Sequence, residues 1–437
     1  MKKTLLTLVA IMVVVAIMLT CFVGCDNTTT NTDNGQTNNG TNSGDNSGNT
    51  AALSLSNIKV GLICLHDKSS TYDKNFIVAM EEVQRELGLS NEQVIIKTGI
   101  PEGVECFNAA EEMVAAGCNV IIADSFGHEA YMIQAAKKYP NTLFCHATGT
   151  KAHTEKLPNY VNAFASIYEG RYLAGVVAGM KLKEMLDAGT VTSAKVGYIG
   201  AFTYAEVISG YTSWFLGVRS IVPTATMAVT FTGSWYDETA ENNAAKKLIN
   251  DNGCVLISQH ADSMGAPNAC EEAGVPNVSY NGSTYDSCPD TFLVSSRINW
   301  APYYKYVIES KIAGKTTAEI GYDYVGTIAT GSVQLTALGD AVAAGTQAKL
   351  DEVKAGLADG SIKVFATNTF TVTTRNGDVE TSAPLTTYLA DVDDMGDYVG
   401  ETEVIANGEF QESKFRSAPY FDIPIDGITL LDLNFGD

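Results

Sequence analysis

The stretch Lys59-Val60-Gly61-Leu62-Ile63-Cys64-Leu65-His66-Asp67 decides the fold of this 437-residue chain. Residues 58–65 form an almost continuous apolar run, which is typical of a parallel strand covered on both faces. A polar loop, Ser69-Ser70-Thr71-Tyr72-Asp73, then leads into apolar residues at helical spacing over 76–87. Ligands of open α/β sheets bind beyond the carboxyl ends of the strands. We therefore expect His66, Asp67, Tyr72, Asp73 and Phe76 at the mouth of a ligand site.

Strand patterns and helical patterns alternate from residue 56 to about residue 299, which indicates parallel α/β structure. The first set of predicted strands is 58–65, 94–97, 120–123, 142–146 and 160–163. The second set is 195–199, 227–231, 255–258, 278–280 and 291–295. The predicted helices are 76–87, 106–116, 130–139, 168–187, 206–220, 238–250, 265–273 and 302–311.

The two strand sets begin with similar sequences. Lys59-Val60-Gly61-Leu62-Ile63 is echoed by Lys195-Val196-Gly197-Tyr198-Ile199, and Gly117-Cys118 is echoed by Gly253-Cys254 at the same spacing. Two similar α/β lobes therefore fit the pattern better than one very wide sheet. Further strand patterns at 322–326, 362–372 and 428–433 accompany a turn-rich, acidic stretch at 373–428, which we expect to be a peripheral decoration.

The N-terminus has the pattern of a signal peptide over residues 1–24, in which Lys2 and Lys3 precede an apolar run. The run ends in Cys21-Phe22-Val23-Gly24-Cys25, which resembles a bacterial lipobox and implies acylation of Cys25. An ordinary signal peptide with a chance cysteine is the alternative. Residues 26–50 contain no apolar side chain, so we expect a disordered polar linker over 25–55 that tethers the folded part to the membrane.

The chain is acidic, with a formal net charge of −22. This charge argues against nucleic acid or anionic lipid as a partner of the folded part. Of the nine cysteines, those beyond Cys25 stand largely inside apolar runs, so we expect buried thiols rather than a disulfide framework. A Cys106–Cys118 or a Cys270–Cys288 disulfide bridge is the alternative.

The usual catalytic motifs are absent from the sequence. It contains no Gly-x-Ser-x-Gly, no His-Glu-x-x-His and no Gly-x-Gly-x-x-Gly after either first strand. Four of the five histidines, His66, His128, His146 and His260, end or closely follow predicted strands. They could form a metal set, but none has helical i, i+4 spacing, so we expect ligand or loop hydrogen bonds instead. We expect no enzyme activity, no metal and no cofactor.

Aromatic and hydrogen-bonding side chains gather at the predicted strand ends. A planar heteroaromatic ligand suits such a site, because rings stack on its faces while Asp, Asn, Gln and His bind its edges. Core packing is the alternative role for each aromatic residue alone. The candidates beyond the first strand are Phe126, His146, Trp235, Gln259, His260, Asp262 and Asn281.

Three stretches carry a resemblance to a known family. They are the first strand with Asp67 and Asp73-Lys74-Asn75-Phe76, the helix Tyr168-Glu169-Gly170-Arg171-Tyr172-Leu173-Ala174-Gly175, and the turn Gly233-Ser234-Trp235-Tyr236-Asp237. They resemble motifs of the basic membrane protein (Bmp/PnrA-like) family, the substrate-binding lipoproteins of nucleoside ABC transporters. The resemblance runs from about residue 58 to residue 311.

The resemblance implies a type I periplasmic-binding-protein fold, with two Rossmann-like lobes of parallel sheet joined by three crossovers. Lobe 1 would comprise 56–165 and 298–325, and lobe 2 would comprise 166–297 and 326–437 with the C-terminal decoration. It also implies a purine nucleoside between Phe76 and Trp235, with Asp67 accepting a hydrogen bond from the ligand. Asn299 and Trp300 would lie beside the hinge end of the site.

Four positions depart from the family's pattern, namely Ile77, Thr148, Asn281 and Ile298. Several of the family residues replaced there hold the ribose. A purine therefore stays expected, while a free nucleobase or another small heteroaromatic compound stays open as the ligand.

These features predict a monomeric, lipid-anchored solute-binding protein on the extracytoplasmic face of a membrane of the Gram-positive type. It would deliver a purine nucleoside or nucleobase to an ABC transporter permease. The alternatives are a nucleoside-processing enzyme of the same lobed shape, such as a hydrolase or phosphorylase, and a membrane-tethered sensor.

Overall fold

The first sheet has six parallel strands in the order β11-β5-β4-β3-β1-β2. This computed structural model describes residues 52–377, 379–393 and 401–432. The predicted signal peptide and lipobox, and the predicted linker up to residue 51, lie outside the described residues. The strands are β1 Val60–Ile63, β2 Val94–Lys97, β3 Val120–Ala123, β4 Leu143–Ala147, β5 Tyr160–Ala165 and β11 Asp323–Gly326. We call this sheet and the helices packed on it the first lobe.

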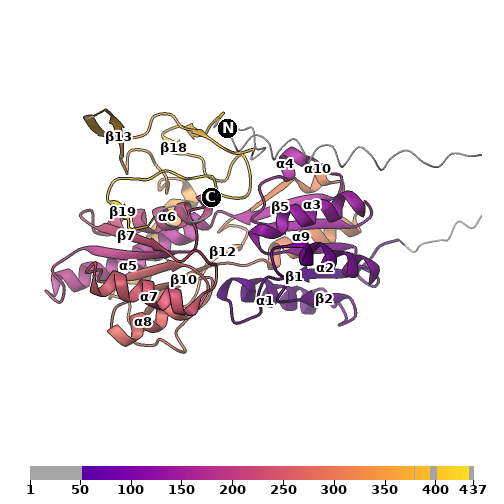
Figure 1. Cartoon of the computed structure of the whole chain (residues 1–437), viewed down its shortest axis with the longest axis horizontal. Helices are drawn as coiled ribbons and strands as arrows, with labels where there is room; N and C mark the ends of the chain where they lie inside the picture. The colour runs from indigo at the N-terminus through magenta and orange to yellow at the C-terminus, as the bar shows by residue number, and fades with distance from the viewer. Residues whose placement is uncertain (1–51, 378, 394–400, 433–437) are drawn as a thin grey trace, which may run out of the picture. The chain divides into compact units, whose positions relative to one another are not determined.

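Helices cover both faces of the first sheet (Figure 1). The larger ones are α1 Thr71–Glu86, α2 Val104–Ala115, α3 Glu129–Lys138 and α9 Ala301–Ile312, with the short helices η1 Phe126–His128, α4 Ala152–Glu155 and α10 Thr317–Ile320. Because side chains alternate along a strand, Val60 and Leu62 face α1 and α9, whereas Ile63 faces α2 and α3. The predicted parallel α/β arrangement is therefore present.

The second sheet has seven strands in the order β12-β10-β9-β8-β6-β7-β19 and is parallel except for β12. The strands are β6 Lys195–Gly200, β7 Thr226–Phe231, β8 Ile257–His260, β9 Asn277–Tyr280, β10 Phe292–Ile298, β12 Val333–Leu335 and β19 Ile428–Leu430. Its helices are α5 Ile167–Asp187, α6 Ala205–Ile221, α7 Glu238–Asn250, α8 Gly265–Ala273 and α11 Thr346–Asp359. We call this assembly the second lobe.

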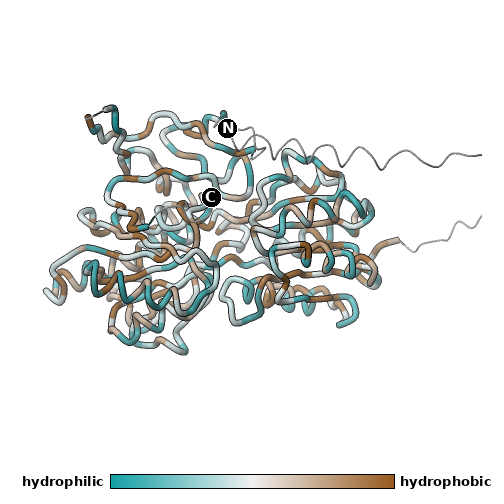
Figure 2. The backbone as a smooth tube through the Cα atoms, in the orientation of Figure 1, coloured by the Kyte–Doolittle hydropathy of each residue, from teal (hydrophilic) through white to brown (hydrophobic). Residues whose placement is uncertain are grey.

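Hydrophobic and hydrophilic residues alternate along the helices (Figure 2), as expected for helices that bury one side. Helix α7 buries Ala245 and Leu248 against the second sheet, with Ala244 and Ile249 packed beside them. The chain passes between the two sheets three times, after β5, after β10 and after β11. Within the described ranges, no helix is both long enough and apolar enough to cross a lipid bilayer.

The C-terminal part folds against the second lobe beside α6 and β7 (Figure 1). It forms the short pairs β13 Val372–Asn376 with β14 Val379–Ala383, β15 Leu389–Ala390 with β16 Thr402–Glu403, and β17 Ile405–Ala406 with β18 Glu409–Phe410. The strand predicted at 362–372 does not form, because Phe365 and Phe370 pack into an aromatic cluster with Phe421 instead of joining a ladder. Strand β19 then closes the edge of the sheet beside β7.

Seven cysteines within the described residues are free and buried, which confirms the expected small hydrophobic thiols. They are Cys64, Cys106, Cys118, Cys145, Cys254, Cys270 and Cys288. Neither the Cys106–Cys118 nor the Cys270–Cys288 bridge is formed, because all four of these residues are free thiols.

Candidate ligand-binding site

A cavity of about 710 Å³ is lined by three parts of the chain. The first lobe contributes Leu65, His66, Tyr72, Asp73, Ser125, Phe126, Thr148 and Thr150. The second lobe contributes Thr203, Tyr204, Ala205, Glu206, Trp235, His260, Asp262 and Tyr280. The C-terminal part contributes Asp391, Arg416, Ala418, Pro419, Tyr420 and Asp422. The volume of the cavity lies within the range of small-molecule sites, which is roughly 300–1,000 Å³.

The two lobes touch each other around this cavity. The backbone N–H of Thr71 donates to the carbonyl oxygen of Asp262 at 3.1 Å. The side chain of Asn75 donates to that of Asn281 at 3.2 Å. The rings of Phe126 and Tyr204, from opposite lobes, lie 5.0 Å apart. The structure therefore has the lobes closed on each other.

Asp73 is fixed in the first turn of α1 by the residues that start this helix. Ser70 caps the helix by accepting from the Asp73 N–H, and its hydroxyl donates to the Asp73 carboxylate at 2.6 Å. The backbone N–H of His66 donates to the same carboxylate at 2.8 Å. Burial opposes ionisation of Asp73, but hydrogen bonds from His66 and Ser70 outweigh it and lower its pKa. Asp73 thus presents a negative charge to the cavity.

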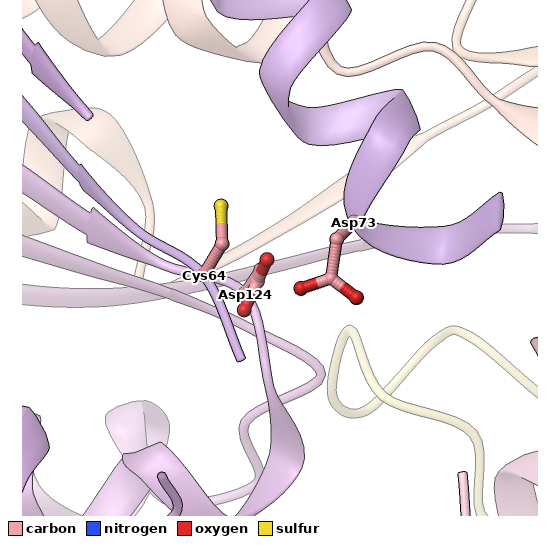
Figure 3. A group of neighbouring side chains, drawn as sticks. All are labelled: Cys64, Asp73 and Asp124. Atoms are coloured by element: carbon pink, nitrogen blue, oxygen red, sulfur yellow. The ribbon is translucent and has the colours of Figure 1, made fainter. Parts of the chain in front are cut away.

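Behind Asp73 lies a buried group that includes Asp124 and Cys64 (Figure 3). Asp124 lies between the other two side chains, and potential ligand atoms of all three lie within 4.8 Å of one another. Burial and the charge of Asp73 raise the pKa of Asp124, which favours its protonated form, whereas the lowered pKa of Asp73 favours its carboxylate. Burial likewise raises the pKa of the Cys64 thiol. Three such groups can bind a cation, but the raised pKa values of Asp124 and Cys64 favour the neutral forms of these two groups, which bind cations weakly.

Asp262 is the acidic group that the second lobe places at the cavity from the end of β8. Its side chain is buried, and its backbone N–H donates to the Trp235 carbonyl oxygen at 2.9 Å. Burial, followed by the charges of Asp73, Glu241 and Glu206, raises the pKa of its carboxyl group. Burial at this position therefore disfavours the charged form of the Asp262 carboxyl group.

Trp235 belongs to a cluster of rings at the cavity. Its indole lies 5.0 Å from Phe202 in an edge-to-face arrangement and 6.1 Å from Tyr204. Tyr204 in turn contacts Phe126 of the first lobe. The loops after β6 and β7 carry Tyr204 and Trp235, so this cluster forms where strand ends of the second sheet meet the first lobe.

Seven of the residues expected at the site line the cavity, and they come from both lobes. They are His66, Tyr72, Asp73, Phe126, Trp235, His260 and Asp262. His260 Nε2–H also donates to the Glu206 carboxylate at 2.8 Å, so these two side chains hold each other in place.

The predicted stacking residue Phe76 does not line the cavity. It is fully buried in the first lobe, where its ring stacks on Trp300 at 4.3 Å. The physical reason is the helical period, because Phe76 shares the sheet-facing side of α1 with Met80 and Val83. Trp300 has the same core role, so neither ring is placed for a ligand in this closed arrangement.

The other predicted residues that do not line the cavity bind local backbone groups or residues across the lobe boundary. Asp67 is exposed and accepts from the N–H and hydroxyl of Ser69. His146 contacts the Ser125 carbonyl oxygen at 2.7 Å, and Gln259 donates to the carbonyl oxygens of Ala261 and Ser263. Asn299 accepts from the N–H of Ala301 at the start of α9, and Asn281 accepts from Asn75.

Sequence reasoning missed several lining residues. Glu206 follows a predicted strand, so the strand-end rule that found Asp262 could have found it as well. Arg416, Tyr420 and Asp422 lie in a stretch without periodic patterning, and no sequence signal indicates them. The stretch expected to be a peripheral decoration therefore supplies part of the cavity.

The fold and the cavity define a two-lobed protein with a cavity of small-molecule size between its lobes. The family described as "ABC transporter substrate-binding protein PnrA-like" (Bmp) matches residues 60–364, and the chain belongs to this family. The resemblance inferred from the sequence motifs is thereby confirmed. Members of this family are extracytoplasmic solute-binding proteins and not enzymes, which excludes a nucleoside-processing enzyme.

Two relatives with different printed ligands match the chain. A purine-binding protein of Brucella abortus is 32% identical over 257 residues, which cover 58% of this chain and 69% of that protein. A Haloferax volcanii protein named as an ABC transporter glucose-binding protein is 33% identical over 209 residues, which cover 48% of this chain and 50% of that protein.

Solved structures show the same fold at low sequence identity. A solute-binding protein of an ABC transporter system from Conexibacter woesei matches with a TM-score of 0.56 and 21% identity, over 70% of this chain and 98% of that chain. The predicted type I periplasmic-binding-protein fold is therefore confirmed.

Proposed function

We propose that this protein is a lipid-anchored receptor that binds a purine nucleoside or nucleobase between its lobes and delivers it to an ABC transporter permease. The observation that carries the proposal is the cavity itself. It combines the rings of Trp235, Tyr204 and Phe126 with the carboxyl groups of Asp73 and Asp262. Aromatic faces suit a flat ring system, and carboxyl groups suit the N–H donors and ring nitrogens at its edge.

The charge of the cavity narrows the ligand class. Five acidic residues line it, namely Asp73, Glu206, Asp262, Asp391 and Asp422, against one arginine. A phosphate group would be repelled by this surface, and burying it unpaired beside carboxylates would cost several kcal/mol, of order 5. We therefore expect a neutral purine compound and not a nucleotide. The name of the Brucella abortus relative supports a purine.

A hexose is the second candidate ligand, because the Haloferax volcanii relative is named for glucose and the carboxylates of the cavity could also accept from sugar hydroxyls. A thermal-shift screen with adenosine, guanosine, inosine, their free bases, AMP and glucose separates the candidates. A bound ligand at 100 times its dissociation constant adds about 2.7 kcal/mol of stability, which is a readily measured shift. We expect a purine nucleoside or base to raise the melting temperature and AMP to leave it unchanged. A shift with glucose alone would refute the purine assignment.

The proposed anchor lies outside the described residues and is tested separately. Replacing Cys25 with Ala should remove the acylation site, so that the protein leaves the membrane fraction and no longer incorporates a labelled fatty acid. The matched control is Cys21→Ala, which removes the other N-terminal cysteine and should leave both properties unchanged. Membrane retention of the Cys25 variant would contradict a lipid anchor. We further propose that the receptor acts as a monomer.

A further inference from the structure

The C-terminal part of the chain builds one side of the cavity that the family-matched region does not contain. The family match ends at residue 364, whereas the cavity extends to residues 416–422. We call residues 409–426 the C-terminal wall. Resting on the proposed function, we propose that this wall selects the ligand, with the Asp422 carboxylate accepting a hydrogen bond from a hydroxyl or amino group of the solute.

The C-terminal wall is fixed firmly to the second lobe. Phe421 stacks on Phe365 with ring centroids 4.4 Å apart. Glu412 is buried and accepts from the hydroxyl of Ser209 on α6 at 2.5 Å. The carbonyl oxygen of Asp426 accepts from the Arg219 guanidinium at 2.9 Å. Groups presented by the wall are therefore held in defined positions, which selective binding requires.

The wall also reaches the first lobe. The backbone N–H and the hydroxyl of Ser417 donate to the Asp323 carboxylate at 2.9 and 2.8 Å. Asp323 is the first residue of β11, the edge strand of the first sheet. The wall thus bridges both lobes beside the cavity, and a ligand enclosed between the lobes would meet it.

Asp422 is the carboxylate that the wall presents to the cavity. Arg416 donates to the carbonyl oxygens of Ala418 and Pro419 at 3.1 and 2.9 Å, so its guanidinium shapes the turn. Asp422 is exposed at the cavity and accepts from the Tyr388 hydroxyl at 2.6 Å. A carboxylate offers about four acceptor positions, so one bond to Tyr388 leaves others for donors on a solute.

The variant Asp422→Asn tests this role, because it keeps the size of the side chain and an oxygen for Tyr388 but removes the charge. The chain offers a matched control in Asp340→Asn. Asp340 is also exposed and also accepts from a tyrosine hydroxyl, that of Tyr285 at 2.6 Å, but it does not line the cavity. Calorimetric titration of both variants would use adenosine, guanosine, inosine, their 2′-deoxy and 5′-deoxy analogues, the free bases and glucose.

We expect Asp422→Asn to weaken binding of the best wild-type ligand at least about tenfold and to leave the melting temperature of the empty protein unchanged. The difference in affinity between Asp422→Asn and the wild type should shrink towards zero for the analogue that lacks the recognised donor. Asp340→Asn should bind every probe as the wild type does. Equal affinities of wild type and Asp422→Asn for all bound probes would overturn this inference and leave the proposed function standing. A wild-type protein that binds none of the probes would overturn the proposed function, and the inference with it.

Discussion

Phe76 and Trp235 differ in their surroundings, although the sequence motifs imply the same role for both. Phe76 is fully buried against Trp300 and the first sheet, whereas Trp235 is half-buried at the cavity. The helical spacing that predicts α1 also places Phe76 on its core side together with Met80. Family motifs alone do not distinguish a ring that touches a ligand from one that supports the loop beside it.

We predict that Phe76→Ala and Trp235→Ala have different effects. Phe76→Ala should lower the free energy of unfolding by about 3–5 kcal/mol, because it opens a void in a closed core. Trp235→Ala should weaken ligand binding at least about tenfold, or about 1.4 kcal/mol, with a much smaller loss of stability. Urea unfolding and calorimetric titration measure the two effects. A stable Phe76→Ala variant with weakened binding would contradict the core assignment.

The buried proton on Asp124 makes stability depend on pH with a definite sign. The folded protein holds this proton above the ordinary carboxyl pKa of 3.8, whereas the unfolded chain releases it there. The stability contributed by Asp124 is therefore complete below that value and decreases as pH rises towards the raised pKa. Asp124→Asn cannot lose a proton, so its stability relative to the wild type should improve between pH 5 and pH 9. Urea unfolding measures both proteins at pH 5 and at pH 9. The same difference in the free energy of unfolding between Asp124→Asn and the wild type at the two pH values would contradict this.

Helices α5 and α6 pack closely because each has a glycine where the other's backbone approaches. A Cβ atom at Gly217 would collide with the carbonyl oxygen of Tyr172, and one at Gly175 would collide with that of Trp214. The approach leaves no space for even a methyl group, so these glycines fix the distance between the helices.

We predict that Gly217→Ala destabilises the second lobe by about 1–3 kcal/mol. Alanine favours a helix by up to about 1 kcal/mol, but the collision with fixed backbone outweighs that gain. Thermal unfolding measures the change, and Glu184→Ala on the exposed side of α5 is the control, which should stay within about 0.5 kcal/mol of the wild type. An unchanged melting temperature of Gly217→Ala would show that the helices can separate freely.

The predictability of elements followed the strength of their patterning. Apolar runs located β1 and β3, which are fully buried, and apolar residues at helical spacing located α5 and α7. The strand predicted from the apolar pattern at 362–372 is wrong, because Phe365 and Phe370 are buried by ring packing and not in a strand ladder. Short pairs such as β17 with β18 contain too few residues to show a period.

The candidate site shows the same limit at the residue scale. The rule that ligands bind beyond strand ends located Asp73, Trp235 and Asp262, since it depends only on chain order. It could not locate Asp422 or Tyr420, because their place at the cavity depends on how the C-terminal wall packs against α6. Contacts between distant parts of the chain decide those positions.

On the scale of the whole molecule, contacts between the lobes hold the closed state. Asn75 and Asn281 bond across the lobe boundary, and neither lines the cavity. Measured affinity depends on the fraction of molecules that can reach the closed state, so a contact made only there strengthens binding without touching the ligand.

We predict that Asn75→Ala weakens ligand binding by about 2- to 10-fold, since one net hydrogen bond contributes about 0.5–1.5 kcal/mol. Titration calorimetry measures the affinity, and Asn91→Ala on the exposed surface of the same lobe is the control. Small-angle scattering should show a larger radius for the empty Asn75→Ala protein than for the wild type. Wild-type affinity and radius would show that this bond does not favour closure.

The reactivity of the seven buried thiols reports when the interior of the protein becomes exposed. Three of them lie within α2, β4 and α8, Cys64 directly follows β1, and all seven are free thiols. An alkylating reagent added from solution can reach such sulfur atoms only during an excursion that exposes the interior. Pulse alkylation read by mass spectrometry would therefore report which sheet opens first, and no engineered probe is needed.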